Sequence, residues 1–171
     1  QDIKLVLIFY HIPRIKYTKE KITFIKWMFC KMEKSGMNKS VAKEWLQKAW
    51  HDISSARILF EANHFTDTIG VDLHYSIEKI LKSFLAYENK KIERTHELFK
   101  IYELVKSYLK LDNHEIKLLV IATKYHITEA YPSFGRQMPS RNEIKEILEF
   151  TEGLFDRVCS ILDIEKSDVM K

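Results

Sequence analysis

The sequence predicts an all-α protein, an antiparallel bundle of about five helices that follows a short N-terminal extension. The chain holds only four glycines and three prolines in 171 residues, too few for the many tight turns of a β-sandwich or barrel. From residue 37 onward, apolar residues recur at helical spacing, and only short links interrupt them. With 46% hydrophobic and 30% charged residues, the composition is typical of one globular domain with a substantial core.

Residues 1–36 differ from the rest and form the extension. Residues 3–12 are rich in branched and aromatic side chains, as in a strand, while 21–32 fit a strand or a short helix, and 33–37 indicate a break. Three interpretations stay open: a small extra element, the tail of an upstream module, or a non-native stretch before a start at Met37. We interpret the extension as accessory or extraneous, residues 37–165 as the bundle and 166–171 as a tail.

Five helices are expected in the bundle. The first spans residues 40–63, and its inward face consists of Val41, Trp45, Ala49, Ala56, Leu59 and Phe60. The second spans residues 67–87, and its inward face consists of Leu73, Ile77, Ile80, Leu81 and Phe84. The third begins with Thr95 as its N-cap and buries Leu98, Ile101, Leu104 and Tyr108. Capping boxes, Asp112 with Glu115 and Ser140 with Glu143, open the last two. The fourth helix ends before Pro132, and its predicted inward residues are Ile116, Leu119, Val120, Thr123 and Ile127. The fifth helix ends near Leu162, and its predicted inward residues are Ile144, Ile147, Leu154, Val158 and Ile161.

Charge and motifs exclude several classes of function. Residues 1–36 hold eight basic and three acidic residues, whereas the remainder holds 20 basic and 21 acidic, so bulk charge does not indicate nucleic-acid binding by the bundle. No apolar run approaches the length of a membrane span. Cys30 and Cys159 match no metal-ligand spacing and favour a reduced, cytoplasmic protein. No phosphate-binding loop, nucleophile elbow or metal motif occurs, so we expect neither a metal nor a cofactor.

Polar residues in the first two helices are the first candidates for a site. Asp52 falls on an apolar face and needs a partner, which is either a structural pair with a Lys or His of the second helix or part of a site. On the second helix, Glu78 and Lys82 form a favourable i,i+4 pair. Tyr75, Lys79 and Lys82 are either a solvated flank or a cationic edge that faces a phosphate or a base.

Two further regions carry candidate residues. His96 follows Thr95 at a helix start with basic residues upstream, which is either an anion site or a simple cap. His126 is interpreted as half-buried. Tyr131, Arg136 and Arg141 belong to a loop and helix start that are either a nucleotide surface or solvated.

Residues 37–162 resemble the HEPN domain, a helical module named for higher eukaryotes, prokaryotes and nucleotide binding. Four stretches carry the resemblance: WLQKAWHDISSARILFEANHFTDT, HYSIEKILKSFLAY, RTHELFKIYELV and AYP. The resemblance implies a helical bundle that often dimerises. It also implies a small nucleotidyltransferase as a frequent partner in a toxin–antitoxin-like pair. Some members are metal-independent RNases that use an Arg, four to six residues and a His around the fourth helix.

This sequence departs from that RNase motif. No Arg occurs between Thr95 and Gly135, so the fourth helix cannot supply the Arg of the motif. Arg57 and His64 have the spacing of the motif, but they lie at the end of the first helix. The resemblance therefore implies a non-catalytic homodimer that binds a nucleotide, RNA or the nucleotidyltransferase, through Asp52, Tyr75, Glu78, Lys79, Lys82, His96 and Tyr131. The alternatives are an endoribonuclease with His96 or His126 as the base and Arg136 or Arg141 beside it, and a purely structural dimerisation bundle.

Overall fold

The computed structural model of the chain describes the backbone of residues 19–128 and 138–171, and the side chains of 38–126 and 138–171. The chain divides into two compact units, Gln1–Ser35 and Gly36–Lys171. In the first unit, the described part is helical from Lys19 onward. The second unit holds the bundle.

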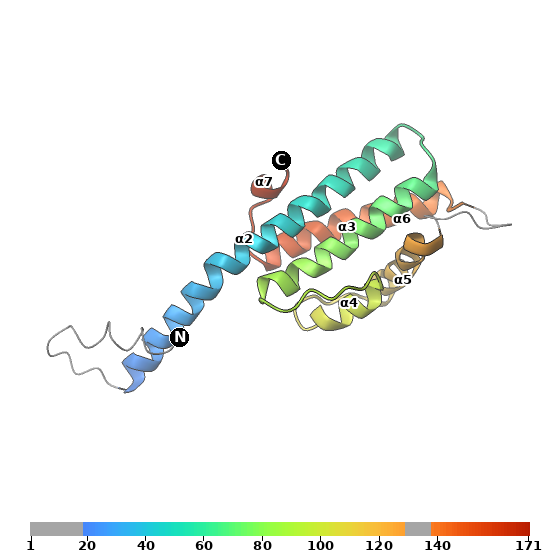
Figure 1. Cartoon of the computed structure of the whole chain (residues 1–171). Helices are drawn as coiled ribbons and strands as arrows, with labels where there is room; N and C mark the ends of the chain where they lie inside the picture. The colour runs from blue at the N-terminus through green and yellow to red at the C-terminus, as the bar shows by residue number, and fades with distance from the viewer. Residues whose placement is uncertain (1–18, 129–137) are drawn as a thin grey trace. The chain divides into compact units, whose positions relative to one another are not determined.

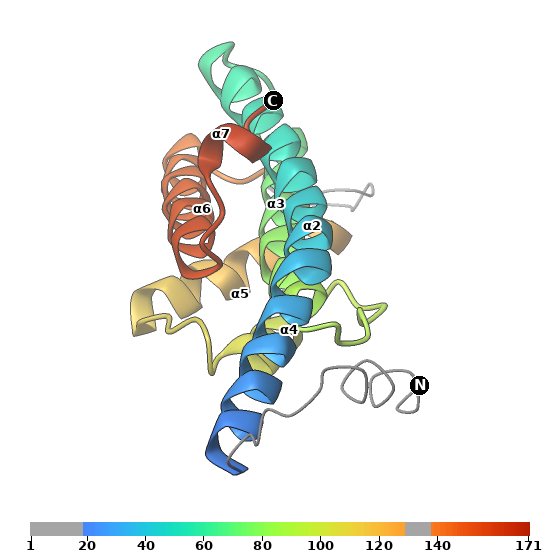
Figure 2. The ribbon, with the colours of Figure 1, turned by 90° about the vertical axis from the view of Figure 1, so that its left-hand side faces the viewer.

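The described residues form helices and no strand, which confirms the prediction of an all-α bundle (Figure 1). The helices are α2 (Lys19–Glu61), α3 (Thr66–Tyr87), α4 (Leu98–Val105), α5 (Asn113–Thr128), α6 (Arg141–Ile161) and α7 (Lys166–Val169). Helix α3 packs against α4, α5 and α6, and it is therefore the central element of the bundle. Figure 2 shows the short α7 beside α2, where the Lys43 ammonium binds the Asp168 carboxylate.

Two boundaries differ from the sequence prediction. Residues 21–37 are part of α2, which runs without interruption through 33–37, so the expected break there is wrong. One Gly inside a helix costs only about 1 kcal/mol, which neighbouring good helix formers offset. Residues 166–171, expected to be a tail, include α7, and this short helix buries Val169.

Helix α2 buries the predicted row only in part: Ala49 and Ala56 are fully buried, and Leu59 and Phe60 are partly buried against the core. The predicted row gave weight to large side chains, yet Val41 is exposed and Trp45 only half-buried. The fully buried row repeats at spacings of three and four and consists of Ala42, Leu46, Ala49, Ile53 and Ala56. Its alanines allow the backbone of α2 to approach the bundle closely, and Trp50 packs on Phe155 beside this row, with ring centroids 5.5 Å apart.

Several predicted inward residues of the later helices are exposed: Leu104, Tyr108, Val120 and Ile161. Helix α4 begins at Leu98, with Glu97 rather than Thr95 as N-cap, and it ends at Val105, so Tyr108 lies beyond it. Its buried face is Leu98, Ile101, Tyr102 and Val105, a regular i, i+3, i+4, i+7 set.

Local signals determine most of the helix ends. Asp112 Oδ1 accepts from the backbone N–H of Glu115, and Glu115 Oε2 accepts in return from the N–H of Asp112, so this predicted capping box is confirmed. Ser140 Oγ accepts from the N–H of Glu143 as expected. Helices α2, α3 and α6 are each followed by a left-handed residue: Asn63, Asn89 and Asp163. Asn89 thereby turns the chain out of α3 into the segment 88–97.

Candidate functional site

Helix α3 buries 15 of its 22 residues, so each polar side chain among them needs a partner. Ser76 and Ser83 bond back to carbonyls of the same helix and need nothing else. His74, Glu78 and Lys82 follow one another at intervals of four and therefore share one face. All three are almost fully buried, and they contact one another as well as groups from other parts of the chain.

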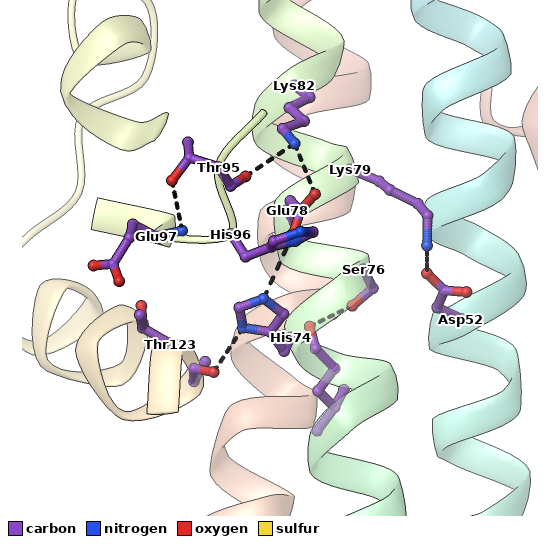
Figure 3. A network of polar contacts seen from close by, with 12 residues as sticks. Asp52, His74, Ser76, Glu78, Lys79, Lys82, Thr95, His96, Glu97 and Thr123 are labelled. Atoms are coloured by element: carbon purple, nitrogen blue, oxygen red, sulfur yellow. Dashed lines mark hydrogen bonds and ion pairs between the residues drawn. The ribbon is translucent and has the colours of Figure 1, made fainter. Parts of the chain in front are cut away.

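The Glu78 carboxylate is the centre of this group (Figure 3). Its Oε1 accepts from Nζ of Lys82 at 2.8 Å, and its Oε2 accepts from Nδ1 of His96 at 2.8 Å. Burial raises the pKa of Glu78, but the surrounding side chains of His74, Lys82 and His96 outweigh burial and lower the pKa to about 2. Glu78 is therefore a carboxylate at neutral pH.

The segment 88–97 brings His96 to this carboxylate. Lys82 donates a second hydrogen bond to the carbonyl of Thr95 at 3.1 Å, so α3 holds two successive residues of the segment. Thr95 Oγ1 accepts from the N–H of Glu97 and shapes the turn before α4. The His96 side chain nevertheless keeps 50% of its surface exposed. Its ring is both fixed in place and accessible.

His126 of α5 lies between two other imidazoles. Its ring stacks on His96, with centroids 4.2 Å apart, and on His74, with centroids 5.0 Å apart. Tyr75 contacts the His96 and His126 rings edge-to-face, at 6.3 and 5.6 Å. Burial lowers the pKa of His126, and the positive potential of His96 and His74 lowers it further. We name His74, Glu78, Lys82, His96 and His126 the histidine cluster.

Asp52 and Lys79 form a separate pair on the adjacent face of α3, toward α2 (Figure 3). This is the structural pair that the sequence offered as one interpretation of Asp52. Lys79 Nζ also lies 5.3 Å from the centroid of the Tyr75 ring, which links the pair to the edge of the histidine cluster. Burial raises the pKa of nearby Asp72, and the negative charge of Asp52 raises it further.

The structure brings together four of the predicted site residues, Tyr75, Glu78, Lys82 and His96, and adds the alternative residue His126. Arg141 is engaged elsewhere: its guanidinium donates to the carbonyls of Phe60 and His64. Tyr131 and Arg136 lie outside the described residues.

Sequence reasoning missed His74, although the signal was present. Its spacing of four from Glu78 places it on the face of Glu78 and Lys82, where a buried histidine needs partners. His74, His96 and His126 each offer a ring nitrogen within 4.8 Å of the others, a set of metal-ligand type. The three are far apart in the sequence and match no spacing motif.

Comparison with known proteins identifies the fold that carries this cluster. The HEPN domain model matches residues 42–162, which include α3, α4, α5 and the whole histidine cluster. The chain belongs to the HEPN domain family. The resemblance noted in the sequence is thus confirmed.

A solved structure shows a similar arrangement of helices. The crystal structure of TT1696 from Thermus thermophilus aligns with a TM-score of 0.59 and 16% sequence identity, over 70% of this chain and 97% of that chain. At this identity the likeness shows the fold alone. No curated protein sequence matches this HEPN chain. Within the described residues, no helix is long and apolar enough to cross a bilayer.

Proposed function

We propose that this HEPN module binds a nucleotide or a short stretch of single-stranded RNA at the histidine cluster and Tyr75, without cleaving it. The observation that carries the proposal is the His96 ring, which is half exposed yet held by Glu78 on one edge and stacked on His126. A fixed, accessible ring is a preorganised surface for a nucleobase, because bases stack on histidine and tyrosine rings.

Charge beside the ring supports a phosphate-bearing ligand. Lys79 lies against Tyr75, and Lys90, Lys91 and Arg94 are exposed residues of the segment 88–97, which also contains His96. Lys82 is unsuited to direct phosphate binding because it is buried between Glu78 and the Thr95 carbonyl. We therefore assign Lys82 a positioning role and assign ligand contact to Tyr75, Lys79 and His96.

The test is binding of fluorescent ATP and of a labelled short single-stranded RNA to the full chain, followed by anisotropy. Base stacking is worth about 1–3 kcal/mol, so His96→Ala should weaken binding by about 5- to 150-fold. The matched control is His114→Ala, an exposed histidine that pairs with Glu146, and it should bind as the wild type does. If neither ligand binds the wild type in a saturable way, the proposal fails.

A second candidate function is metal-independent RNA cleavage. His96 and His126 are two imidazoles in contact, and a carboxylate orients one of them, an arrangement suited to general acid–base catalysis. RNA integrity, read on gels of the same samples with EDTA present, decides between the two. Cleavage that both His96→Ala and His126→Ala abolish would establish the enzyme, and intact RNA would dismiss it.

A homodimer and a nucleotidyltransferase partner stay predictions from the family. Sedimentation of the full chain tests the first. Co-purification with a coexpressed small nucleotidyltransferase tests the second.

A further inference from the structure

Three histidines from separate parts of the chain meet at one point of the bundle. His74 comes from α3, His96 from the segment 88–97 and His126 from α5, and one ring nitrogen of each lies within 4.8 Å of the others. Imidazole nitrogen is the ligand that zinc and similar divalent transition metals share. The hydrogen bonds of the three rings decide whether those nitrogens are free to bind.

The proton of His74 is placed by its surroundings. Nδ1 of His74 lies 3.0 Å from the carbonyl oxygen of Ala122, and a carbonyl only accepts, so Nδ1 carries the hydrogen. If the ring carries only this hydrogen, Nε2 presents its lone pair. This atom is fully buried, has no hydrogen-bond partner, and lies 3.6 Å from the carboxylate oxygen Oε2 of Glu78.

The lone pair of a buried ring nitrogen and a nearby carboxylate oxygen repel each other unless a positively charged group lies close to both atoms. Two such positive charges are chemically available. One is a second proton, which makes His74 an imidazolium, and the other is a metal cation.

The other two histidines have the same character. Nδ1 of His96 donates to Glu78, which leaves Nε2 of the neutral ring as an acceptor. Nδ1 of His126 is buried without a hydrogen-bond partner. Metal-binding histidines typically donate one ring N–H to a carbonyl or a carboxylate and present the other nitrogen, which is the pattern of His74 and His96.

We propose that His74, His96 and His126 form a binding site for a divalent transition-metal ion of the zinc type, with Glu78 as the carboxylate that orients His96. Zinc–nitrogen bonds of about 2.0–2.1 Å require the three nitrogens to converge on one point. The rings are stacked, with interplanar angles of 20° and 22°, so His96 and His126 must rotate to converge. The His96 ring can turn about the Nδ1–Glu78 hydrogen bond that fixes its position, because the ring is half exposed and lies in a non-helical segment. Three protein ligands would leave a fourth position open.

This inference does not rest on the proposed nucleotide function, and its test uses metal binding alone. The full chain, treated with EDTA and then freed of it, is titrated with Zn²⁺ in competition with a chromogenic chelator. The visible absorption of added Co²⁺ reports the coordination geometry. We expect one tight equivalent and a Co²⁺ spectrum typical of tetrahedral coordination.

The variants are His96→Gln and His126→Gln, which leave the buried His74 intact, and the matched control is His114→Gln. Each cluster variant should weaken Zn²⁺ binding at least tenfold, and the control should not change it. Circular dichroism checks that every variant is folded. Absence of a tight equivalent in the wild type overturns the proposal and leaves the protonated His74 as the explanation of the contact. Binding that survives both cluster substitutions overturns it as well.

Discussion

Nδ1 of His96 donates to Oε2 of Glu78 across 2.8 Å, so one side-chain contact joins α3 to the segment that leads into α4. The other carboxylate oxygen is bound by Lys82, which also reaches the Thr95 carbonyl. The position of His96 therefore depends on the buried ion pair between Glu78 and Lys82.

Lys82→Met should strongly destabilise the protein. The substitution keeps the volume but leaves Glu78 without its cation in a nearly buried place, and removal of one partner of a buried pair costs about 3–5 kcal/mol. Urea unfolding, followed by circular dichroism, measures the loss. The double variant Glu78→Gln/Lys82→Met should lose less than the sum of the two single variants, since neither charge is then left alone. Additive losses would show that the two side chains do not interact.

Asp72→Asn should raise the free energy of unfolding at neutral pH, by less than about 1 kcal/mol because Asp72 is only half-buried. Burial and the charge of Asp52 raise the pKa of Asp72, so the folded state binds its proton more tightly than the unfolded chain does. The free energy of unfolding of the wild type therefore rises as the pH falls. The rise begins near the pKa that Asp72 has in the folded protein and is complete below the ordinary value of 3.8.

The advantage of the Asn variant should accordingly shrink as the pH falls. Urea unfolding at several pH values measures this trend. A variant less stable than the wild type at pH 7 would show that the Ser55 hydrogen bond to the carboxylate outweighs the repulsion from Asp52.

Gly70→Ala and Gly153→Ala form a matched pair of helix substitutions with opposite expected signs. A Cβ on Gly70 would lie 3.1 Å from ring atoms of Tyr125, and this buried ring is held by its hydroxyl, which donates to Glu143 at 2.7 Å. Overpacking costs about 1–3 kcal/mol, which exceeds the gain of about 1 kcal/mol in helix propensity. A Cβ on Gly153 meets nothing within 4 Å, so that variant should gain stability. Thermal unfolding of both variants compares them, and an equally stabilised Gly70→Ala would show that the Tyr125 ring moves freely.

Arg141→Ala should destabilise the turn between α2 and α3 and leave ligand binding unchanged. The guanidinium donates to the carbonyls of Phe60 and His64 and lies 4.3 Å from the centroid of the Phe60 ring. Loss of charged hydrogen bonds should cost about 1.5–3 kcal/mol. The control is Arg57→Ala, which removes an exposed ion pair with Glu152 and should cost under about 1 kcal/mol. Nucleotide or RNA binding lost with Arg141→Ala, at unchanged stability, would return Arg141 to the candidate site.

Local rules account for what the sequence predicted well. The capping box at Asp112 and the cap that Ser140 forms on the N–H of Glu143 involve residues three apart, and their signal survives in any tertiary context. Asp52 showed that a partner was needed, because a carboxylate among apolar neighbours is costly alone, and the partner proved to be Lys79.

The rest depends on contacts that no local pattern contains. His74 Nδ1 bonds a carbonyl 48 residues away, and the meeting of three histidines requires α3, α5 and the segment between them to be packed. The buried row of α2 was predicted only in part for a related reason. Ala49 and Ala56 were placed correctly, but the large apolar Val41 is exposed, whereas the small Ala42 next to it is fully buried.

The contacts of α2 with the C-terminal part of the chain have a consequence for synthesis on the ribosome. Lys39 binds Asp163, and Lys43 binds Asp168, pairs separated by 124 and 125 residues. The described part of α2 therefore emerges early but completes its packing only after α6 and α7 have been made. Until then, Trp50 of α2 also lacks its contact with Phe155 of α6 and stays open to other chains, which is the interval in which aggregation competes with folding.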